Sequence, residues 1–161
     1  MRIIGIDPGT ATTGFGVIEA VGGNYKFIDA GVITTKPDIS MPERLSQIYT
    51  DLTQLVNEVK PEAAAIELLF FGNNVTTAIT VGQARGVALL VLHNYGLPIA
   101  EYNPMQIKVA ITGYGAAKKP QIQEMVKMLL KLPQIPKPDD AADALAIAIT
   151  HANSFGRNNE H

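Results

Sequence analysis

The apolar positions at the start of the chain follow a strand pattern. Ile3, Ile4 and Ile6 form a β-branched run, typical of a buried strand, that ends in the turn sequence Asp7-Pro8-Gly9. Two more apolar segments, residues 15–20 and 25–34, predict strands joined by a turn at 21–24. The three segments therefore predict an antiparallel meander whose first strand ends in a carboxylate. On this motif alone, Asp7 is equally consistent with a simple turn former and with a functional acid.

The rest of the chain alternates between helical and strand patterns. Residues 42–59 have apolar side chains at helical spacing, with Ser40 as a candidate cap. Residues 63–69 are nearly all apolar, as in a strand buried on both faces, and 97–102 predict a short fifth strand. Further helices are expected at 76–93, 104–111, 120–131 and 140–152, with a loop at 70–74. This order predicts an α/β fold in which the first, fourth and fifth strands form the parallel part of a five-stranded mixed sheet flanked by helices.

The composition is that of an ordinary globular protein. The 161 residues suggest one domain over 1–161, with a flexible tail from about residue 154. The chain is 47% hydrophobic and 17% charged, which is enough apolar material for a real core. The lack of cysteine excludes disulfides and thiolate metal sites, and fits a reducing cytoplasm. No apolar run of about 18 residues and no secretion signal is present, so neither a membrane span nor export is expected.

Charge is distributed unevenly along the chain. Residues 102–138 contain six lysines and a single acid, Glu124, a local balance of +5 that leaves −7 for the rest, because the whole chain carries −2. A basic patch beside an acidic pocket suits a metal-dependent enzyme that acts on a polyanion. A solvated helical face that carries lysines explains the same pattern, and the charges alone favour that explanation.

Three acidic sites occur where the predicted topology brings them together. Asp7 ends the first strand, Glu67 lies near the end of the fourth, and Asp-Asp-Ala-Ala-Asp at 139–143 starts the last helix. Glu67 is the strongest clue, because an unpaired carboxylate buried in that apolar run is costly. A salt bridge to Arg85 or Arg2 is the alternative for Glu67, and ordinary helix capping is the alternative for the aspartates.

The ligand types indicate which metal would suit this site. Hard carboxylate oxygens without cysteine or paired histidine fit Mg²⁺ or Mn²⁺ rather than zinc. Two such ions about 4 Å apart can activate a water and stabilise the leaving oxygen of a phosphodiester. Helical spacing does not choose between Asp139 and Asp140 as the partner of Asp143. Because Pro138 predicts a helix start just after it, Asp139 is expected as the N-cap, which leaves Asp140 and Asp143 for the metal.

Several long strings in this sequence resemble the RuvC family of bacterial Holliday-junction resolvases, endonucleases with the ribonuclease-H-like fold. The matching segments extend from residue 4 to residue 152 and are IGIDPGTATTGFGVIE, AIELLFFGNN, VGQARGVALL, MQIKVAITGYGAAK and DAADALAIAITHA. The resemblance implies that the catalytic, metal-binding carboxylates are Asp7, Glu67, Asp140 and Asp143. It further implies Mg²⁺, for which Mn²⁺ can substitute, and a homodimer that binds four-way junction DNA. Each subunit would nick one of two opposed strands, leaving 5′-phosphate and 3′-hydroxyl ends, in association with a RuvA–RuvB branch-migration complex.

Matching positions also imply DNA-contacting residues. Lys108 and Lys119 resemble the family's phosphate-contacting lysines, and Lys118 is adjacent to the second of them. Phe70 matches an aromatic that the family places near unstacked junction bases, where a ring can stack or wedge. Phe71 offers a second ring, and core filling is the alternative role for Phe70.

Two other functions compete with this interpretation. Ile-Gly-Ile-Asp-Pro-Gly-Thr at 4–10 lies in a segment that also resembles the first phosphate loop of actin-like and sugar-kinase ATPases. Those enzymes close two lobes around a nucleotide, whereas this length accommodates one lobe, and no second glycine-rich phosphate loop is evident. A non-catalytic junction-binding module is the other alternative. Four carboxylates facing phosphates would weaken such a binder by repulsion.

Overall fold

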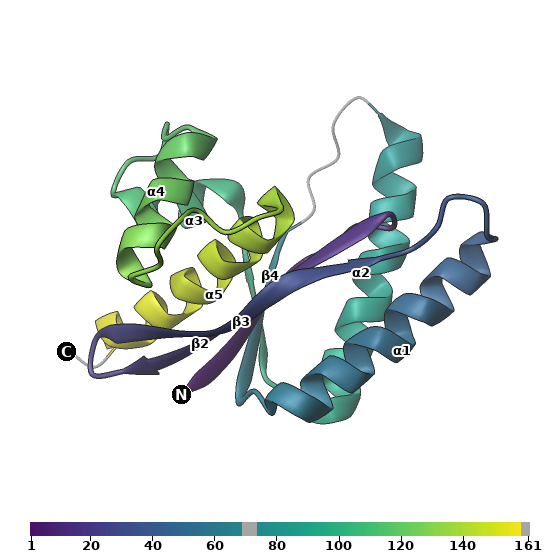
Figure 1. Ribbon diagram of the computed structural model, residues 1–161, viewed down its shortest axis with the longest axis horizontal. Helices are drawn as coiled ribbons and strands as arrows, with labels where there is room; N and C mark the ends of the chain where they lie inside the picture. Colours follow the sequence, from purple (N-terminus) through teal and green to yellow (C-terminus); the bar gives the residue numbers. More distant parts are fainter. Residues whose placement is uncertain (69–73, 159–161) are drawn as a thin grey trace.

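Five strands form one mixed sheet in the computed structural model, which describes residues 1–68 and 74–158 (Figure 1). The strand order is β3-β2-β1-β4-β5. The strands are β1 (Arg2–Asp7), β2 (Thr12–Val21), β3 (Asn24–Thr34), β4 (Ala63–Glu67) and β5 (Ile99–Tyr102). β1 pairs antiparallel with β2, and β2 with β3, whereas β1 with β4 and β4 with β5 are parallel. The predicted meander and the predicted parallel half of the sheet are both confirmed.

Five helices cover the two faces of this sheet. They are α1 (Met41–Val59), α2 (Val75–Tyr95), α3 (Pro104–Thr112), α4 (Lys119–Leu129) and α5 (Asp139–Asn158). Ser40 caps α1 as predicted, because its side chain accepts the Glu43 backbone N–H. Figure 1 shows α1 and α2 on one side of the sheet and α3, α4 and α5 on the other.

The last helix is longer than the sequence pattern predicts. α5 continues to Asn158, beyond the predicted helix end at Ala152. Side chains near the predicted end are anchored to neighbouring elements: Asn153 Nδ2 donates to the Ala110 carbonyl at 3.0 Å, and Tyr102 Oη donates to Ser154 Oγ at 3.1 Å. The partners in these contacts belong to α3 and β5. Because they are distant in sequence, the helical periodicity of residues 140–152 does not indicate them.

The alternation of side chains along β1 and β4 determines the face of the sheet to which Asp7 and Glu67 point. Ile4 and Ile6 of β1 belong to the core beneath α1 and α2, whereas Ile3 belongs to the core beneath α5. Successive side chains of a strand point to opposite faces, so Asp7 falls on the α5 face with Ile3. Ala63 and Ala65 of β4 face the same core as α5, and Glu67 therefore shares that face.

Three glycines allow α5 to approach this face closely. Gly5 pairs with Gly16, and Asp7 with Gly14, across the β1–β2 register. A Cβ atom on Gly14 would collide with the Asp140 carbonyl oxygen, and one on Gly16 would lie 2.7 Å from the Leu145 nitrogen. The missing side chains therefore let the first turns of α5 rest directly on the sheet beside Asp7. The hydrophobic pattern of the strands carries no signal for this role of the glycines.

The α2 helix has both a buried and an exposed apolar face. By length and composition alone it could cross a membrane, although the sequence predicts no membrane span. However, residues such as Ala84, Ala88 and Leu92 are buried in the core between the sheet and the helices α1 and α2. The core helix of a globular protein can have the same length and apolar composition as a membrane span. Ile79 and Leu90 are 56% and 51% exposed, so the helix presents apolar side chains outward as well.

Candidate active site

Three carboxylates converge at the end of β1. Asp7 is the last residue of that strand, and Asp140 and Asp143 lie in the first turns of α5. One carboxylate oxygen from each lies within 4.8 Å of those of the other two, and all three side chains are half-buried. The strand alternation and the glycine contacts with α5 produce this arrangement. Oxygen ligands so close together are suited to a hard divalent cation.

Burial and the proximity of the other carboxylates disfavour the ionised form of the acids in this cluster. Burial raises the pKa of Asp7 to about 8, with further contributions from the charges of Asp143 and Asp140. The charge of Glu67 and a hydrogen bond with Asp140 act in the same direction. Burial also raises the pKa of Asp143, although Lys119 opposes this effect. A cation among these oxygens would relieve the repulsion, which is the electrostatic signature of a metal site.

Glu67 lies at the edge of this cluster rather than inside it. Burial raises its pKa, followed by the charge of Asp143, while Lys108 and Lys119 partly offset the effect. A small hollow lined by both Asp7 and Glu67 connects it to the three-acid cluster. The carboxylate therefore faces the same end of the sheet, as the sequence predicts.

The salt bridges considered as alternatives for Glu67 do not form. In residues 1–68 and 74–158, Arg2 pairs with Glu19 at 3.4 Å and Arg85 pairs with Glu101. Arg85 Nε donates a hydrogen bond to the backbone carbonyl oxygen of Glu67 at 3.5 Å, and not to its carboxylate. Arginine pairing thus does not account for this buried carboxylate.

Asp139 differs from its neighbour in both exposure and partners. It is the first residue of α5, and the Ala141 N–H donates to the Pro138 carbonyl, so the predicted N-cap role of Asp139 is wrong. Its carboxylate instead accepts a hydrogen bond from Gln123 Nε2 at 3.1 Å and lies 3.5 Å from Lys119 Nζ. Both partners belong to α4, a segment distant in sequence. Asp139 therefore faces α4, while Asp140 joins the acidic cluster.

The predicted lysines lie beside the acids. Lys108 of α3 and Lys118 and Lys119 at the start of α4 line a hollow of about 340 Å³ together with Glu67 and Asp143. Lys119 Nζ lies 3.5 Å from an oxygen of Asp143. Burial lowers the pKa of Lys119, but the charges of Asp143 and Asp139 outweigh it and raise the pKa. The basic patch beside an acidic pocket is thus present. Phe70 and Phe71 lie outside the described residues.

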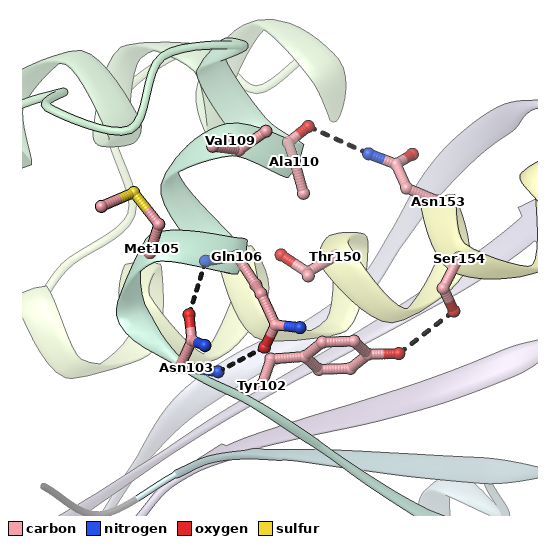
Figure 2. A pocket seen from close by; sticks show the side chains of 9 residues that line it. All are labelled: Tyr102, Asn103, Met105, Gln106, Val109, Ala110, Thr150, Asn153 and Ser154. Carbon is pink, nitrogen blue, oxygen red and sulfur yellow. Dashed lines mark hydrogen bonds between the residues drawn. The ribbon is translucent and has the colours of Figure 1, made fainter.

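Another hollow, of about 470 Å³, lies between α3 and the second half of α5 and contains none of the predicted site residues (Figure 2). Its polar groups are engaged with one another: Asn103 accepts the Gln106 N–H, and Asn153 donates to Ala110. His151 lies next to it, buried, with Nδ1 2.7 Å from Tyr102 Oη. Burial lowers the pKa of His151, which fits a neutral core histidine rather than a site residue.

A sheet of order β3-β2-β1-β4-β5, with acids at the ends of β1 and β4 and on the helix packed against them, defines the ribonuclease-H-like class of nucleases. The family model described as crossover junction endodeoxyribonuclease RuvC matches residues 3–151. The chain belongs to the RuvC family and is an endonuclease that hydrolyses phosphodiester bonds.

Two curated relatives carry the same description. The protein of Roseiflexus sp. strain RS-1 is 57% identical over 150 residues, which are 93% of this chain and 89% of that protein. The protein of Desulforamulus reducens is 55% identical over 159 residues, covering 97% of this chain and 98% of the relative. The similarity therefore extends over nearly the whole length of both chains.

Solved structures agree with this assignment. Thermus thermophilus RuvC is 36% identical with a TM-score of 0.90, covering 98% of this chain and 97% of the other. The same protein in complex with a Holliday junction substrate gives a TM-score of 0.94 at 36% identity, covering 98% and 96%. The yeast mitochondrial Holliday junction resolvase, at 12% identity and a TM-score of 0.74, shares the fold.

Proposed function

We propose that this protein resolves four-way DNA junctions by metal-dependent phosphodiester hydrolysis, with paired nicks in two opposed strands that leave 5′-phosphate and 3′-hydroxyl ends. The names of the relatives and the Thermus thermophilus complex with a Holliday junction support this substrate. One observation of the molecule itself carries the proposal. The oxygens of Asp7, Asp140 and Asp143 meet within 4.8 Å, directly beside a hollow lined by lysines.

In this proposal the four carboxylates hold Mg²⁺, with Mn²⁺ as a substitute. The donor set fits, because it consists of half-buried carboxylate oxygens whose mutual repulsion already raises the pKa of Asp7. A metal held there would supply activation of a water and stabilisation of the leaving oxygen. Asp7, Asp140 and Asp143 would supply the clustered oxygens, and Glu67 would approach from the β4 side.

The lysines position the DNA strand. Lys108, Lys118 and Lys119 lie beside Glu67 and Asp143, where ammonium groups can hold backbone phosphates against the acidic cluster. Lys119 already contacts Asp143, so it is placed to exchange a carboxylate for a phosphate oxygen. Phe70 and Phe71 are proposed to stack on unpaired junction bases, on the strength of the family motif alone.

We propose that residues 1–161 form a single nuclease domain that acts as a homodimer in the cytoplasm, together with a RuvA–RuvB complex. A four-way junction has approximate two-fold symmetry, so a two-fold dimer places two active sites on opposed strands. Neither alternative function is favoured. The family similarity extends through the whole fold, which disfavours an ATPase, and a pure binding module gains nothing from converging acids.

The two adjacent aspartates provide the sharpest test. Asp140→Asn should lose Mg²⁺-dependent cleavage of a synthetic four-way junction by orders of magnitude, because it removes a charged ligand from the cluster. Asp139→Asn is the matched control and should keep cleavage, since that carboxylate contacts Gln123 and Lys119 instead. Strand-specific nicks are measured with and without Mg²⁺, and junction binding by gel shift. Full cleavage by Asp140→Asn, or no nicking by the unmodified protein, would refute the proposal.

A further inference from the structure

A second hollow reaches the acidic cluster from the opposite side of the sheet. It measures about 410 Å³ and is formed by the turn after β1, the start of α1 and the first turns of α2. Asp140 contributes to its wall, whereas Asp143 and Glu67 line the lysine hollow among α3, α4 and α5. Figure 1 shows that these two groups of helices lie on opposite faces. The acids therefore lie between the two hollows.

Arg44 is the single cation among the residues that line this second hollow within the described chain. Its Nε donates to Thr35 Oγ1 at 2.8 Å, and Thr35 Oγ1 in turn donates to the Thr10 carbonyl at 2.6 Å. Thr10 Oγ1 donates to the Thr80 carbonyl at 2.8 Å, which ties the turn to α2. This chain of hydrogen bonds holds the base of the guanidinium in place and fixes the wall beside it.

Within the described residues, the outer part of the Arg44 guanidinium has no acidic partner. A guanidinium carries five N–H donors, and Nε accounts for one of them. Arg2 and Arg85 both form ion pairs, whereas no carboxylate in residues 1–68 and 74–158 pairs with Arg44. The side chain is half-buried and lines the hollow.

Two hydroxyl groups complete the lining. Thr12 and Thr77 face the hollow, and within the described residues their side chains take part in no hydrogen bond. A planar guanidinium with neighbouring free hydroxyl donors matches the geometry of a phosphate group, which offers several acceptor oxygens. Phosphate contacts of this kind come mostly from arginine, lysine, serine and threonine side chains.

We propose that this Arg44 hollow binds a backbone phosphate of the cleaved strand, on the other side of the scissile bond from the phosphates held by the lysines. The inference rests on the proposed function and adds a second anchoring point to it. A strand that enters through the lysine hollow and passes the acids must leave across the turn after β1. Because the acidic cluster repels phosphates, a cation on each side holds the strand across it.

The test measures junction binding as a function of salt in the cleavage-deficient Asp7→Asn protein. Arg44→Gln removes the charge but keeps a hydrogen-bonding end toward Thr35, and Arg44→Lys restores the charge. Arg44→Gln should reduce the salt slope by roughly 0.7 to 0.9, the value for one lost phosphate contact, and Arg44→Lys should recover it. Lys26→Ala is the control, because Lys26 is exposed at the opposite end of β3 and its loss should leave the slope unchanged.

A second measurement identifies the phosphate. Neutral methylphosphonates are placed one at a time on either side of the scissile bond. The phosphate bound by Arg44 should lie on the opposite side of the scissile bond from the phosphates whose neutralisation affects the wild-type protein but not a Lys108→Ala variant. Neutralising this one phosphate should weaken binding by the protein that retains Arg44 about tenfold, as expected for a charge-assisted contact. The same substitution should leave binding by Arg44→Gln unchanged. If Arg44→Gln leaves the salt slope unchanged and no single methylphosphonate affects the two proteins differently, the inference is overturned. The proposed function stands in that case, provided that the unmodified protein still binds and cleaves junctions. A shift of Arg44→Gln to a different oligomeric state would overturn it too, by placing Arg44 in a subunit interface. If the unmodified protein binds no junction, the proposed function itself fails.

Discussion

At the scale of single residues, Asp7 is the most perturbed acid of the site. Its pKa rises from 3.8 to about 8, first through burial and then through the neighbouring carboxylates. Near neutral pH and without a cation, this carboxyl group therefore retains its proton. The glycines beside it and the alternation of β1 force the acid into this position, where it is costly to ionise.

This perturbation predicts how the metal-free protein responds to pH. The folded pKa lies above the unfolded value, so the folded state binds more protons between about pH 4 and pH 8, and stability falls as pH rises through that window. Asp7→Asn should therefore raise the melting temperature in chelator at pH 8 and flatten its dependence on pH, although it abolishes cleavage.

Thermal unfolding from pH 5 to pH 8 measures both effects. Asp38→Asn, at an exposed position before α1, is the control and should follow the unmodified protein. Mg²⁺ should raise the melting temperature of the unmodified protein more than that of Asp7→Asn, because the cation stabilises the ionised cluster. An Asp7→Asn protein that is less stable at pH 8 would contradict this account.

At the scale of elements, the contact of α5 with the β1–β2 pair sets the geometry of the site. Gly14 lies opposite Asp7 in the sheet and directly under the Asp140 carbonyl. The helix that carries two acids is thereby seated against the strand that carries the third. Leu145 and Ile147 of the same helix fill the core on this face, so the contact is also part of the packing that stabilises the fold.

Gly14→Ala should separate the two acids of α5 from Asp7. The added methyl group forces the helix away, at an expected cost of about 1 to 3 kcal/mol in the free energy of unfolding, which is typical of overpacking. Junction cleavage should fall by more than the loss of folded protein explains. Gly31→Ala is the control, since the atoms nearest to its Cβ would be those of the Phe15 ring, at 3.0 Å, rather than the backbone of α5. Chemical denaturation and cleavage assays measure the two quantities, and a fully active Gly14→Ala protein would argue against the geometry.

At the scale of the whole molecule, the exposed apolar face of α2 is the candidate subunit interface. Ile79 and Leu90 are more than half exposed, and their spacing of eleven places them on one side of the helix. The other side of α2 already packs on the sheet. An exposed apolar stripe on a helix that also belongs to the core is typical of a protein interaction surface.

A charge on this stripe should therefore dissociate the proposed homodimer. Leu90→Glu is expected to sediment as a monomer at micromolar concentration and to lose the paired nicking of opposed strands. Met128→Glu changes an apolar residue on α4 that is still more exposed, at 65%, and should leave the oligomeric state unchanged. An unmodified protein that sediments as a monomer yet cleaves with full activity would exclude this interface.

The sequence by itself determined the order and type of the elements and the end of the sheet where the acids gather. Hydrophobic periodicity is a local property, so strands such as β1 and helices such as α1 follow from their own residues. Asp7 and Glu67 could be placed together because the carboxyl ends of parallel neighbouring strands meet at one edge. The long family strings selected Asp140 and Asp143 as their partners on α5.

Only the tertiary structure decided which atoms meet. The glycine contact beneath α5, the pairing of Asp139 with Gln123, and the hollow around Arg44 all join segments that are far apart in sequence. The raised pKa of Asp7 also depends on charges from β4 and α5 that gather only when the chain folds. Local patterns encode the conformation of each segment, whereas these properties arise from packing between segments, and a single sequence carries no local signal for them.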